Sequence, residues 1–226
     1  MKAEKISELT TNRLSVYLRC LNELEAQGEK TVSSSALARK FHLNSAQIRK
    51  DLAYFGEFGT RGVGYCVKEL REHLGKILGL DRNYNIGIVG AGRIGSAIAD
   101  YYGFSQKNFT VAALFDSDPK KIGKKVNGVP VHDIKSFSSV AKKANIEIAI
   151  IAVPGENAQP VLDRIMKAGV RAVLNVAPVP LKAEGDVKVK TVDLTISLES
   201  LSYFLSGDPG SNDGDVKPKS PNSRKQ

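Results

Sequence analysis

A glycine-rich run near the middle of the chain constrains its fold more than any other feature. Residues 87–95 read Gly-Ile-Val-Gly-Ala-Gly-Arg-Ile-Gly, which places the spacing G-x-G-x-x-G at Gly90, Gly92 and Gly95. An apolar stretch precedes the run and a helical pattern follows it, which is the context of the dinucleotide-binding turn of a Rossmann fold. Such a turn normally opens a domain, yet about eighty residues of different character precede it.

The residues of such a turn have separate roles. Gly90 permits the tight bend, Gly92 lets the backbone approach a pyrophosphate, and Gly95 lets the next helix pack on the sheet. The start of that helix presents N–H groups to phosphates, and Arg93 can add a positive charge beside a diphosphate. We therefore expect the whole turn to bind the cofactor: Gly90, Ala91, Gly92, Arg93, Ile94 and Gly95.

An acidic residue, Asp116, closes the second predicted strand at about the spacing, roughly 20 residues, at which a carboxylate binds the adenine ribose diol. A carboxylate there disfavours a 2′-phosphate, so NAD(H) is favoured over NADP(H). Two alternatives remain open: Asp116 only caps the following turn, or Asp118 is the ribose ligand. Lys120 and Lys121 lie nearby and could accommodate a phosphate.

Two segments with proline follow later predicted strands, Ala152-Val-Pro154 and Asn175-Val-Ala-Pro178. Ligands of doubly wound sheets bind beyond the carboxyl ends of the strands. We expect the cofactor to contact Val153, Pro154, Asn175 and Ala177, with Asn175 facing the carboxamide of a nicotinamide. The alternative, that Asn175 serves only the structure of its loop, is equally open.

From residue 84 onward, apolar strands alternate with helices. The predicted strands are 86–89, 109–115, 129–131, 146–153, 172–176 and 187–192, and the predicted helices are 94–102 and 156–168. Apolar strands that alternate with helices indicate a parallel sheet covered on both faces. The fold class is therefore α/β, with a Rossmann-type doubly wound sheet.

The first 80 residues have helical spacing instead. Leu14, Tyr17, Leu18, Leu21 and Leu24 define a first helix, capped by Thr10 or Thr11 and ended by Gly28. Ser33 to Ser35 cap a short second helix, and Asn44 or Ser45 caps a third that carries Ile48, Leu52 and Phe55. Residues 56–64 hold four glycines, which permit a hairpin between Phe58 and the run 65–67. Helix, turn, helix and hairpin in this order predict a winged-helix DNA-binding domain.

The third helix carries polar side chains off its apolar face. Ser45, Gln47, Arg49 and Lys50 suit contacts to base edges and phosphates, and Arg61 at the hairpin tip suits a narrow minor groove. The alternative is a solvated helix face with local charge pairs around Asp51. The net charge of +9 is compatible with a polyanionic partner such as double-stranded DNA.

Other features exclude whole classes of protein. Two cysteines, Cys20 and Cys66, make no disulfide framework, and no Cys/His cluster has the spacing of a metal site. No stretch approaches the roughly 18 apolar residues of a membrane span, and the polar start is unlike a signal peptide. We expect no membrane association and a cytoplasmic setting.

The chain has no room for a substrate domain. Only residues 179–226 follow the last proline segment, and from 207 their composition predicts a disordered tail. His132 is the only histidine after the glycine run and follows the third strand, a poor position for a catalytic acid. We therefore expect no enzyme, although a small NAD-dependent oxidoreductase and a winged-helix regulator that senses coenzyme A remain alternatives. The predicted parts are a winged helix (1–80), a Rossmann domain (81–192), an apolar helix (193–206) and the tail (207–226).

These segments together resemble the Rex family of redox-sensing transcriptional repressors. The resemblance rests on the run from Ile48 to Tyr65, on residues 90–95, on Phe115-Asp-Ser-Asp118, on the two proline segments and on Val192-Asp-Leu-Thr195. It implies a homodimer that binds operator DNA when NADH is low and leaves it when NADH binds. It also implies that the last helix is exchanged between subunits, and that Tyr101 and Asp193 lie near the nicotinamide.

Overall fold

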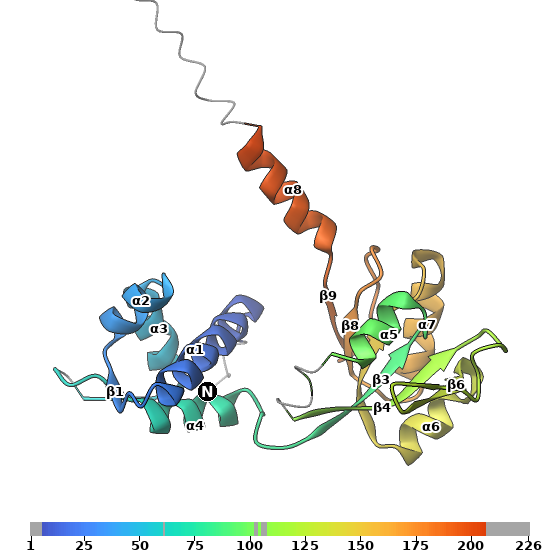
Figure 1. Cartoon of the computed structure of the whole chain (residues 1–226), viewed down its shortest axis with the longest axis horizontal. Coiled ribbons are helices and arrows are strands. Elements are labelled where there is room, and N and C mark those ends of the chain that lie inside the picture. The colour runs from blue at the N-terminus through green and yellow to red at the C-terminus, as the bar shows by residue number, and fades with distance from the viewer. Residues whose placement is uncertain (1–5, 61, 102–103, 105–107, 207–226) are drawn as a thin grey trace, which may run out of the picture. The chain divides into compact units, whose positions relative to one another are not determined.

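The computed structural model describes residues 6–60, 62–101, 104 and 108–206. The chain forms two compact units (Figure 1). One unit contains the residues up to Tyr84 together with the segment 102–110, and the other contains 85–101 and the residues from Val111 onward. The predicted tail from residue 207 lies outside the described residues.

The first unit is helical with one short ribbon. Its elements are α1 (Glu8–Ala26), β1 (Thr31–Val32), α2 (Ser34–Phe41), α3 (Ser45–Phe55), β2 (Tyr65–Cys66) and α4 (Val67–Ile77). Four of the five apolar residues that predicted α1 belong to the core, namely Leu14, Tyr17, Leu21 and Leu24, whereas Leu18 packs against it partly buried. The core is completed by Leu37, Ile48, Leu52, Leu70 and Leu74 from the other three helices.

Each of the first three helices begins at a side chain that accepts a backbone N–H group of its first turn. Ser33 caps α2 by accepting from Ala36, and Asn44 caps α3 by accepting from Gln47, as predicted. The predicted cap of α1 at Thr10 or Thr11 is wrong. Ser7 is the cap, because its hydroxyl accepts the N–H of Thr10 and the helix starts one turn earlier.

The hairpin differs from the prediction in its pairing. β2 pairs with β1, through Val32 and Tyr65, and not with a strand at Phe58. Phe58 instead packs against the helical core, with its ring 5.5 Å from that of His73. A single bridge joins Thr60 and Gly64 in the glycine loop. Gly64 is needed there because a Cβ atom would lie 2.7 Å from the carbonyl oxygen of Val32.

The second unit is a seven-stranded sheet. Its strands are β3 (Tyr84–Val89), β4 (Phe109–Asp116), β5 (Lys125–Val126), β6 (Val129–Asp133), β7 (Ile146–Ile151), β8 (Ala172–Asn175) and β9 (Lys188–Thr191). Their order is β5-β6-β4-β3-β7-β8-β9, and the pairs β4–β6, β3–β7, β7–β8 and β8–β9 are parallel. From β6 to β9 this is the strand order of a Rossmann fold, which confirms the predicted fold class.

Helices cover both faces of this sheet. They are α5 (Arg93–Ala99), a 3-10 turn (Ile134–Ser136), α6 (Phe137–Lys143) and α7 (Gly155–Lys167). Successive residues of β3 point to opposite faces. Val89 packs in the core beneath α6 and α7, whereas Ile88 lies beside Gly95 of α5.

Three elements of this unit differ from the sequence prediction. α5 ends at Ala99, earlier than the predicted end at 102. The helix α6 and the antiparallel edge strand β5 were not predicted. Both are short, and the apolar pattern of α6 is reduced to Phe137, Val140 and Ala141 within one turn, too little for a periodic signal.

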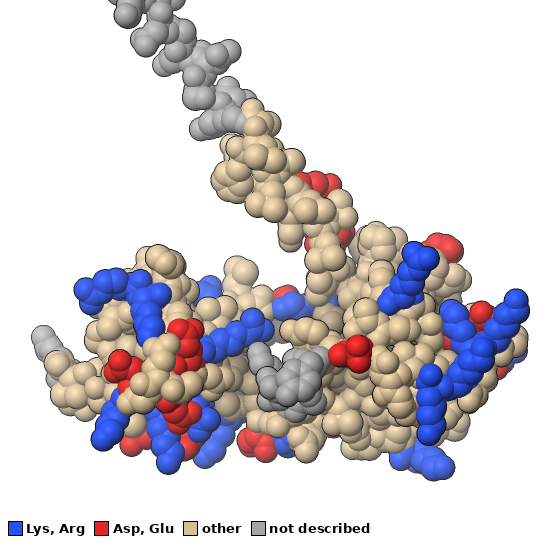
Figure 2. Space-filling view, viewed as in Figure 1, with Lys and Arg blue, Asp and Glu red and all other residues tan. Residues whose placement is uncertain are grey.

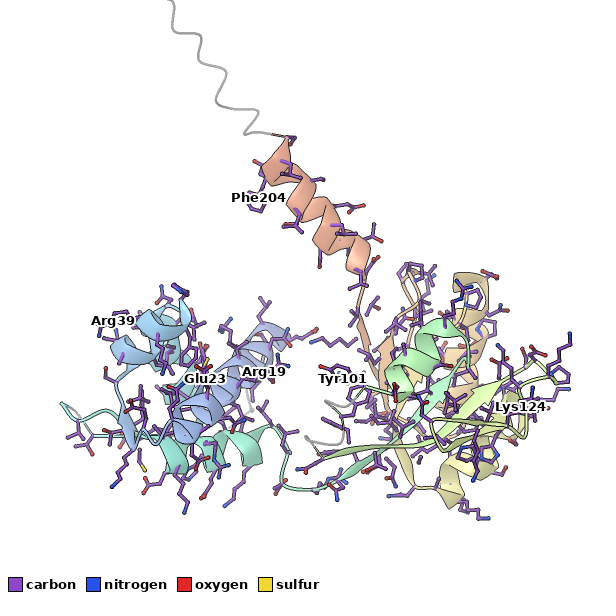
Figure 3. All side chains as sticks on the ribbon, viewed as in Figure 1. Arg19, Glu23, Arg39, Tyr101, Lys124 and Phe204 are labelled. Atoms are coloured by element: carbon purple, nitrogen blue, oxygen red, sulfur yellow. The ribbon has the colours of Figure 1, made fainter. Side chains whose placement is uncertain are left out.

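The last helix, α8 (Leu194–Leu205), starts at the predicted cap, because Asp193 accepts the N–H of Thr195. None of its residues is buried, and Leu194, Phe204 and Leu205 are each at least 74% exposed. Phe204 marks this helix in Figure 3. Among the described residues, no helix combines the length and the apolar character needed to cross a membrane.

Candidate cofactor site and DNA-binding surface

The glycine turn lies between the carboxyl end of β3 and the start of α5. Gly90 has φ +105°, and a Cβ there would lie 2.3 Å from the carbonyl oxygen of Ala152. A Cβ on Gly95 would lie 1.8 Å from the carbonyl oxygen of Gly90. Gly92 is different, since a Cβ there meets nothing within 4 Å. Gly90 and Gly95 are thus required by the protein's own packing, whereas the space at Gly92 is open to a ligand.

Asp116 ends the neighbouring strand β4 and faces this turn. One carboxylate oxygen, Oδ2, accepts the backbone N–H of Ala91 at 2.9 Å and the ammonium of Lys121 at 2.9 Å. The other, Oδ1, accepts the N–H of Asp118 at 2.9 Å. Burial raises the pKa of Asp116, but these hydrogen bonds outweigh it and hold the pKa below its usual value. The carboxylate of Asp116 therefore caps the following turn and also remains negatively charged beside the glycine turn.

Asn175 is fully buried at the end of β8 and is bonded to its own loop. Its Nδ2 donates to the carbonyl oxygens of Ala177 and Val179, at 3.1 and 2.9 Å, and its Oδ1 accepts the N–H of Ala177. This geometry favours the interpretation in which Asn175 builds the loop. Its side-chain oxygen and nitrogen are both engaged with the loop, and the contact with a nicotinamide carboxamide stays a prediction.

The other predicted cofactor residues lie around the same edge of the sheet or at helix ends. Val153 lies beside Gly90, with Cγ1 3.1 Å from the position of a Cβ there, and Pro154 is exposed at the start of α7. Ala177 is buried, and its backbone N–H and carbonyl oxygen are bonded to the side chain of Asn175. The remaining residues are the exposed Arg93, Ile94 and Tyr101 of the α5 region, of which Tyr101 is labelled in Figure 3, and Asp193, the cap of α8.

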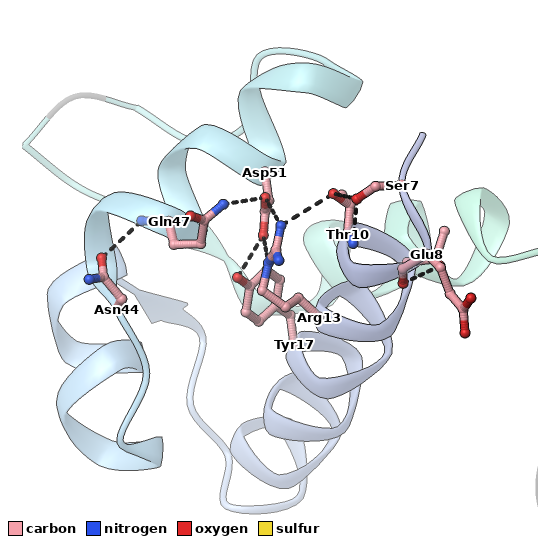
Figure 4. A network of polar contacts seen from close by, with 9 residues as sticks. Ser7, Glu8, Thr10, Arg13, Tyr17, Asn44, Gln47 and Asp51 are labelled. Carbon is pink, nitrogen blue, oxygen red and sulfur yellow. Dashed lines mark hydrogen bonds and ion pairs between the residues drawn. The ribbon is translucent and has the colours of Figure 1, made fainter. Parts of the chain in front are cut away.

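The helical unit contains a buried polar cluster that the sequence analysis missed (Figure 4). Asp51 of α3 is 4% exposed and accepts two hydrogen bonds from Arg13 of α1, at 2.6 and 2.7 Å. Tyr17 donates to Oδ2 at 2.9 Å, and Gln47 donates to Oδ1 at 2.7 Å. The hydrogen bonds from Arg13 lower the pKa of Asp51 although its burial opposes this. The cluster therefore fixes α3 against α1 through a desolvated carboxylate.

This cluster changes the expectation for two residues of α3. Asp51 is not part of a solvated face. Its position between Ile48 and Leu52, on the apolar stripe of the helix, was the feature of the sequence that indicated its burial. Gln47 is half-buried and its Nε2 points to the carboxylate. A carboxylate only accepts hydrogen bonds, so this contact fixes the orientation of the amide.

Ser45, Arg49 and Lys50 lie at the surface of α3, half-buried in the first case and exposed in the others. Arg49 donates to the hydroxyl of Ser34 at 2.9 Å, at the first turn of α2. These two residues line an open groove of about 340 Å³ with Ser33, Phe58 and the glycine loop. Lys and Arg side chains occur over the helical unit in Figure 2, with acidic side chains among them. Arg61 lies outside the described residues.

A helix-turn-helix unit joined to a Rossmann sheet with an open glycine turn defines a class of protein, the DNA-binding regulators that carry a nucleotide site. Comparisons with known proteins agree on both parts. Residues 5–53 match the model of a putative DNA-binding protein N-terminus, and residues 81–179 match the model of a CoA binding domain. The chain belongs to the Rex family of redox-sensing transcriptional repressors, as the resemblance predicted, and is a regulator rather than an enzyme.

The relatives match over nearly the whole chain. The redox-sensing transcriptional repressor Rex of Carboxydothermus hydrogenoformans is 50% identical over 92% of this chain and 100% of its own length. That of Desulfitobacterium hafniense is 47% identical, over 90% and 97%. A crystal structure of RSP with β-NAD⁺ and operator DNA has a TM-score of 0.86, 40% identity and coverage of 90% of this chain and 94% of RSP. The complex of RSP with β-NADH has a TM-score of 0.81, 38% identity and coverage of 90% and 95%.

Proposed function

We propose that this chain is a homodimeric, cytoplasmic repressor that binds operator DNA when NADH is low and releases it when NADH binds. The observation that carries the proposal is the open approach at Gly92 beside the anionic Asp116, in a chain whose other unit is a helix-turn-helix. Residues 90–95 and Val153 would hold the pyrophosphate side, and Asp116 the adenine ribose. Tyr101 and Asp193 would lie toward the nicotinamide.

The cofactor acts in this proposal as a signal. NADH and NAD⁺ differ by a hydride and by one positive charge on the ring, so a sensor must bind them with different affinity in its two states. Major grooves on one side of DNA repeat every 34–36 Å or so, and a modest rotation of two recognition helices therefore breaks their register. Binding energy at the Rossmann unit can in this way be converted into loss of operator affinity.

One titration tests this function against its alternatives. Operator DNA is titrated with the protein in the presence of NADH, NAD⁺, NADPH or coenzyme A. In a separate sample, the protein is incubated with NADH and the consumption of NADH is followed. We expect NADH to release the DNA at the lowest concentration. Release by coenzyme A instead would support the regulator of another adenine cofactor, and consumption of NADH would support an oxidoreductase.

At the DNA, we propose that base edges are contacted by Lys50, Ser45 and the part of the Gln47 amide that is not bonded to Asp51. We also propose that Arg61 enters the minor groove. Arg49 fits a phosphate better than a base. Its guanidinium is bonded to Ser34 at the first turn of α2, where helix N–H groups also favour an anion.

Arg49→Ala is expected to weaken binding to all DNA sequences alike. Loss of one phosphate contact should reduce the slope of log affinity against log salt by about 1. The measurement is the affinity for operator DNA and for random DNA at salt concentrations from about 50 to about 200 mM. Lys143→Ala at the exposed end of α6 is the matched control for loss of a positive charge. Relaxed preference at one operator position, with an unchanged salt slope, would assign Arg49 to a base.

The dimer is proposed to form through α8. This helix exposes Ile196, Leu198, Leu201 and Phe204 by 59–75% although they are apolar, which indicates an interface with a second copy. A groove of about 700 Å³ along α1 and α4 offers apolar surface from Leu18, Leu78, Leu80 and Phe109 for such a helix.

Leu198→Asp combined with Leu201→Asp is therefore expected to give a monomer by light scattering. Operator affinity should fall by at least about tenfold, because two half-sites are no longer bound together. Ser197→Asp combined with Ser200→Asp adds the same two charges at polar positions of α8 and is the control. A double variant that remains dimeric would exclude α8 as the interface.

A further inference from the structure

The ion pair between Lys121 and Asp116 lies at the predicted ribose end of the cofactor site, and the function of this lysine goes beyond charge compensation. Lys121 Nζ lies 2.9 Å from Asp116 Oδ2, with side-chain exposures of 39% and 11%. The backbone of Lys121 is held in place, since its N–H donates to Asp118 and its carbonyl oxygen accepts from Lys124. These two bonds order the backbone from which the lysine side chain reaches the carboxylate.

The carboxylate of Asp116 has little acceptor capacity left for a ribose. It offers about four acceptor positions. Three are taken, two by the N–H groups of Ala91 and Asp118 and one by Lys121. A ribose diol brings two hydroxyl donors. Because the two backbone donors are parts of the fold, the side chain of Lys121 is the one donor that can leave.

The effect of Lys121 on a 2′-phosphate differs from its effect on a ribose diol. A lone carboxylate repels a phosphate, and this repulsion is the usual basis for preferring NAD(H) over NADP(H). Here the ammonium offsets the negative charge and can pair with phosphate oxygens directly. The same lysine thus competes with a 2′-hydroxyl and assists a 2′-phosphate.

On the basis of the function proposed above, we propose that Lys121 is a specificity-determining residue that narrows the preference of this site for NADH over NADPH. It weakens NADH binding, since the diol must displace the ammonium from Asp116. It strengthens NADPH binding, since the ammonium is placed to meet the additional phosphate. In a sensor this residue sets the NADH concentration at which the response begins.

Lys121→Gln tests this inference by calorimetric titration of the full chain with NADH and NADPH. We expect tighter NADH binding and weaker NADPH binding, each by a few-fold. The ratio of the dissociation constant for NADPH to that for NADH should therefore rise by about tenfold, the scale of a part-exposed ion pair. Lys121→Arg keeps the charge and should keep the ratio near that of the wild type. Lys120→Gln removes the neighbouring charge and should also leave the ratio near the wild-type value.

The outcomes separate this inference from the proposed function. A ratio that is unchanged or lower in Lys121→Gln, with thermal unfolding like the wild type, overturns the role of Lys121. A ratio that rises equally in Lys120→Gln overturns it too, because it would reflect general charge near the site. Failure of the wild type to bind NADH at all would instead contradict the proposed function.

Discussion

Gly92→Val is expected to abolish the response to NADH while operator binding is retained. The Cβ position of Gly92 is free of protein atoms within 4 Å, so a valine fits the fold. It would, however, occupy the space through which a pyrophosphate approaches the backbone. We expect NADH affinity to fall by at least about a hundredfold, since the loss of close phosphate contacts costs several hydrogen bonds at once.

Gly95→Val is the contrasting variant for this experiment. Its side chain would collide with the carbonyl oxygen of Gly90, 1.8 Å from the Cβ position, so the Rossmann unit itself should be destabilised. Thermal unfolding, NADH titration and operator binding are measured on both variants. If Gly92→Val keeps the NADH response, the glycine turn is not the phosphate site. If it unfolds as Gly95→Val does, the distinction between packing glycines and the ligand-facing glycine is wrong.

The glycine motif itself predicts that distinction, since its spacing assigns Gly90 and Gly95 to the fold and Gly92 to the ligand. The sequence predicts the strand, the turn and the helix, because the spacing and the apolar context are local. It also predicts a doubly wound sheet of Rossmann type, and the strand order from β6 to β9 is the one that this fold class has. What the sequence does not show is which atoms make Gly90 and Gly95 necessary, namely the carbonyl oxygens of Ala152 and of Gly90 itself.

Two of the errors come from contacts between residues far apart in the chain. β2 found its partner in β1, more than thirty residues earlier, because the glycine loop is too bent to supply a strand at Phe58. Asp51 reads as a surface charge until Arg13 and Tyr17 are placed against it. Polar residues are ambiguous in sequence because burial decides their role.

Asp51→Asn is expected to destabilise the helical unit and to weaken operator binding. The substitution removes the charge that Arg13 and the buried Tyr17 need, and it places an amide nitrogen among three donors. Breaking a buried pair costs about 3–5 kcal/mol, and the one-third exposure of Arg13 reduces this to about 2–3 kcal/mol. Operator affinity should fall by at least about tenfold, because α3 loses its fixed orientation on α1.

The pH dependence of unfolding gives a second measurement of the same cluster. The pKa of Asp51 is lowered in the folded protein, chiefly by the hydrogen bonds from Arg13. Its contribution to the free energy of unfolding is therefore fully present above the unfolded pKa of about 3.9, and it is lost as the pH falls through the folded pKa. Asp51→Asn should be less stable than the wild type at neutral pH, and the two should converge as the pH falls below about 4.

Urea unfolding at a series of pH values measures this convergence, with Glu29→Gln as the control. Glu29 is exposed, so its variant loses the same charge without breaking the cluster and should follow the wild type. Parallel pH profiles for the wild type and Asp51→Asn would show that the carboxylate contributes no charge-dependent stability. A stable Asp51→Asn variant that binds operator normally would show that α3 is oriented by its apolar face alone, through Ile48 and Leu52.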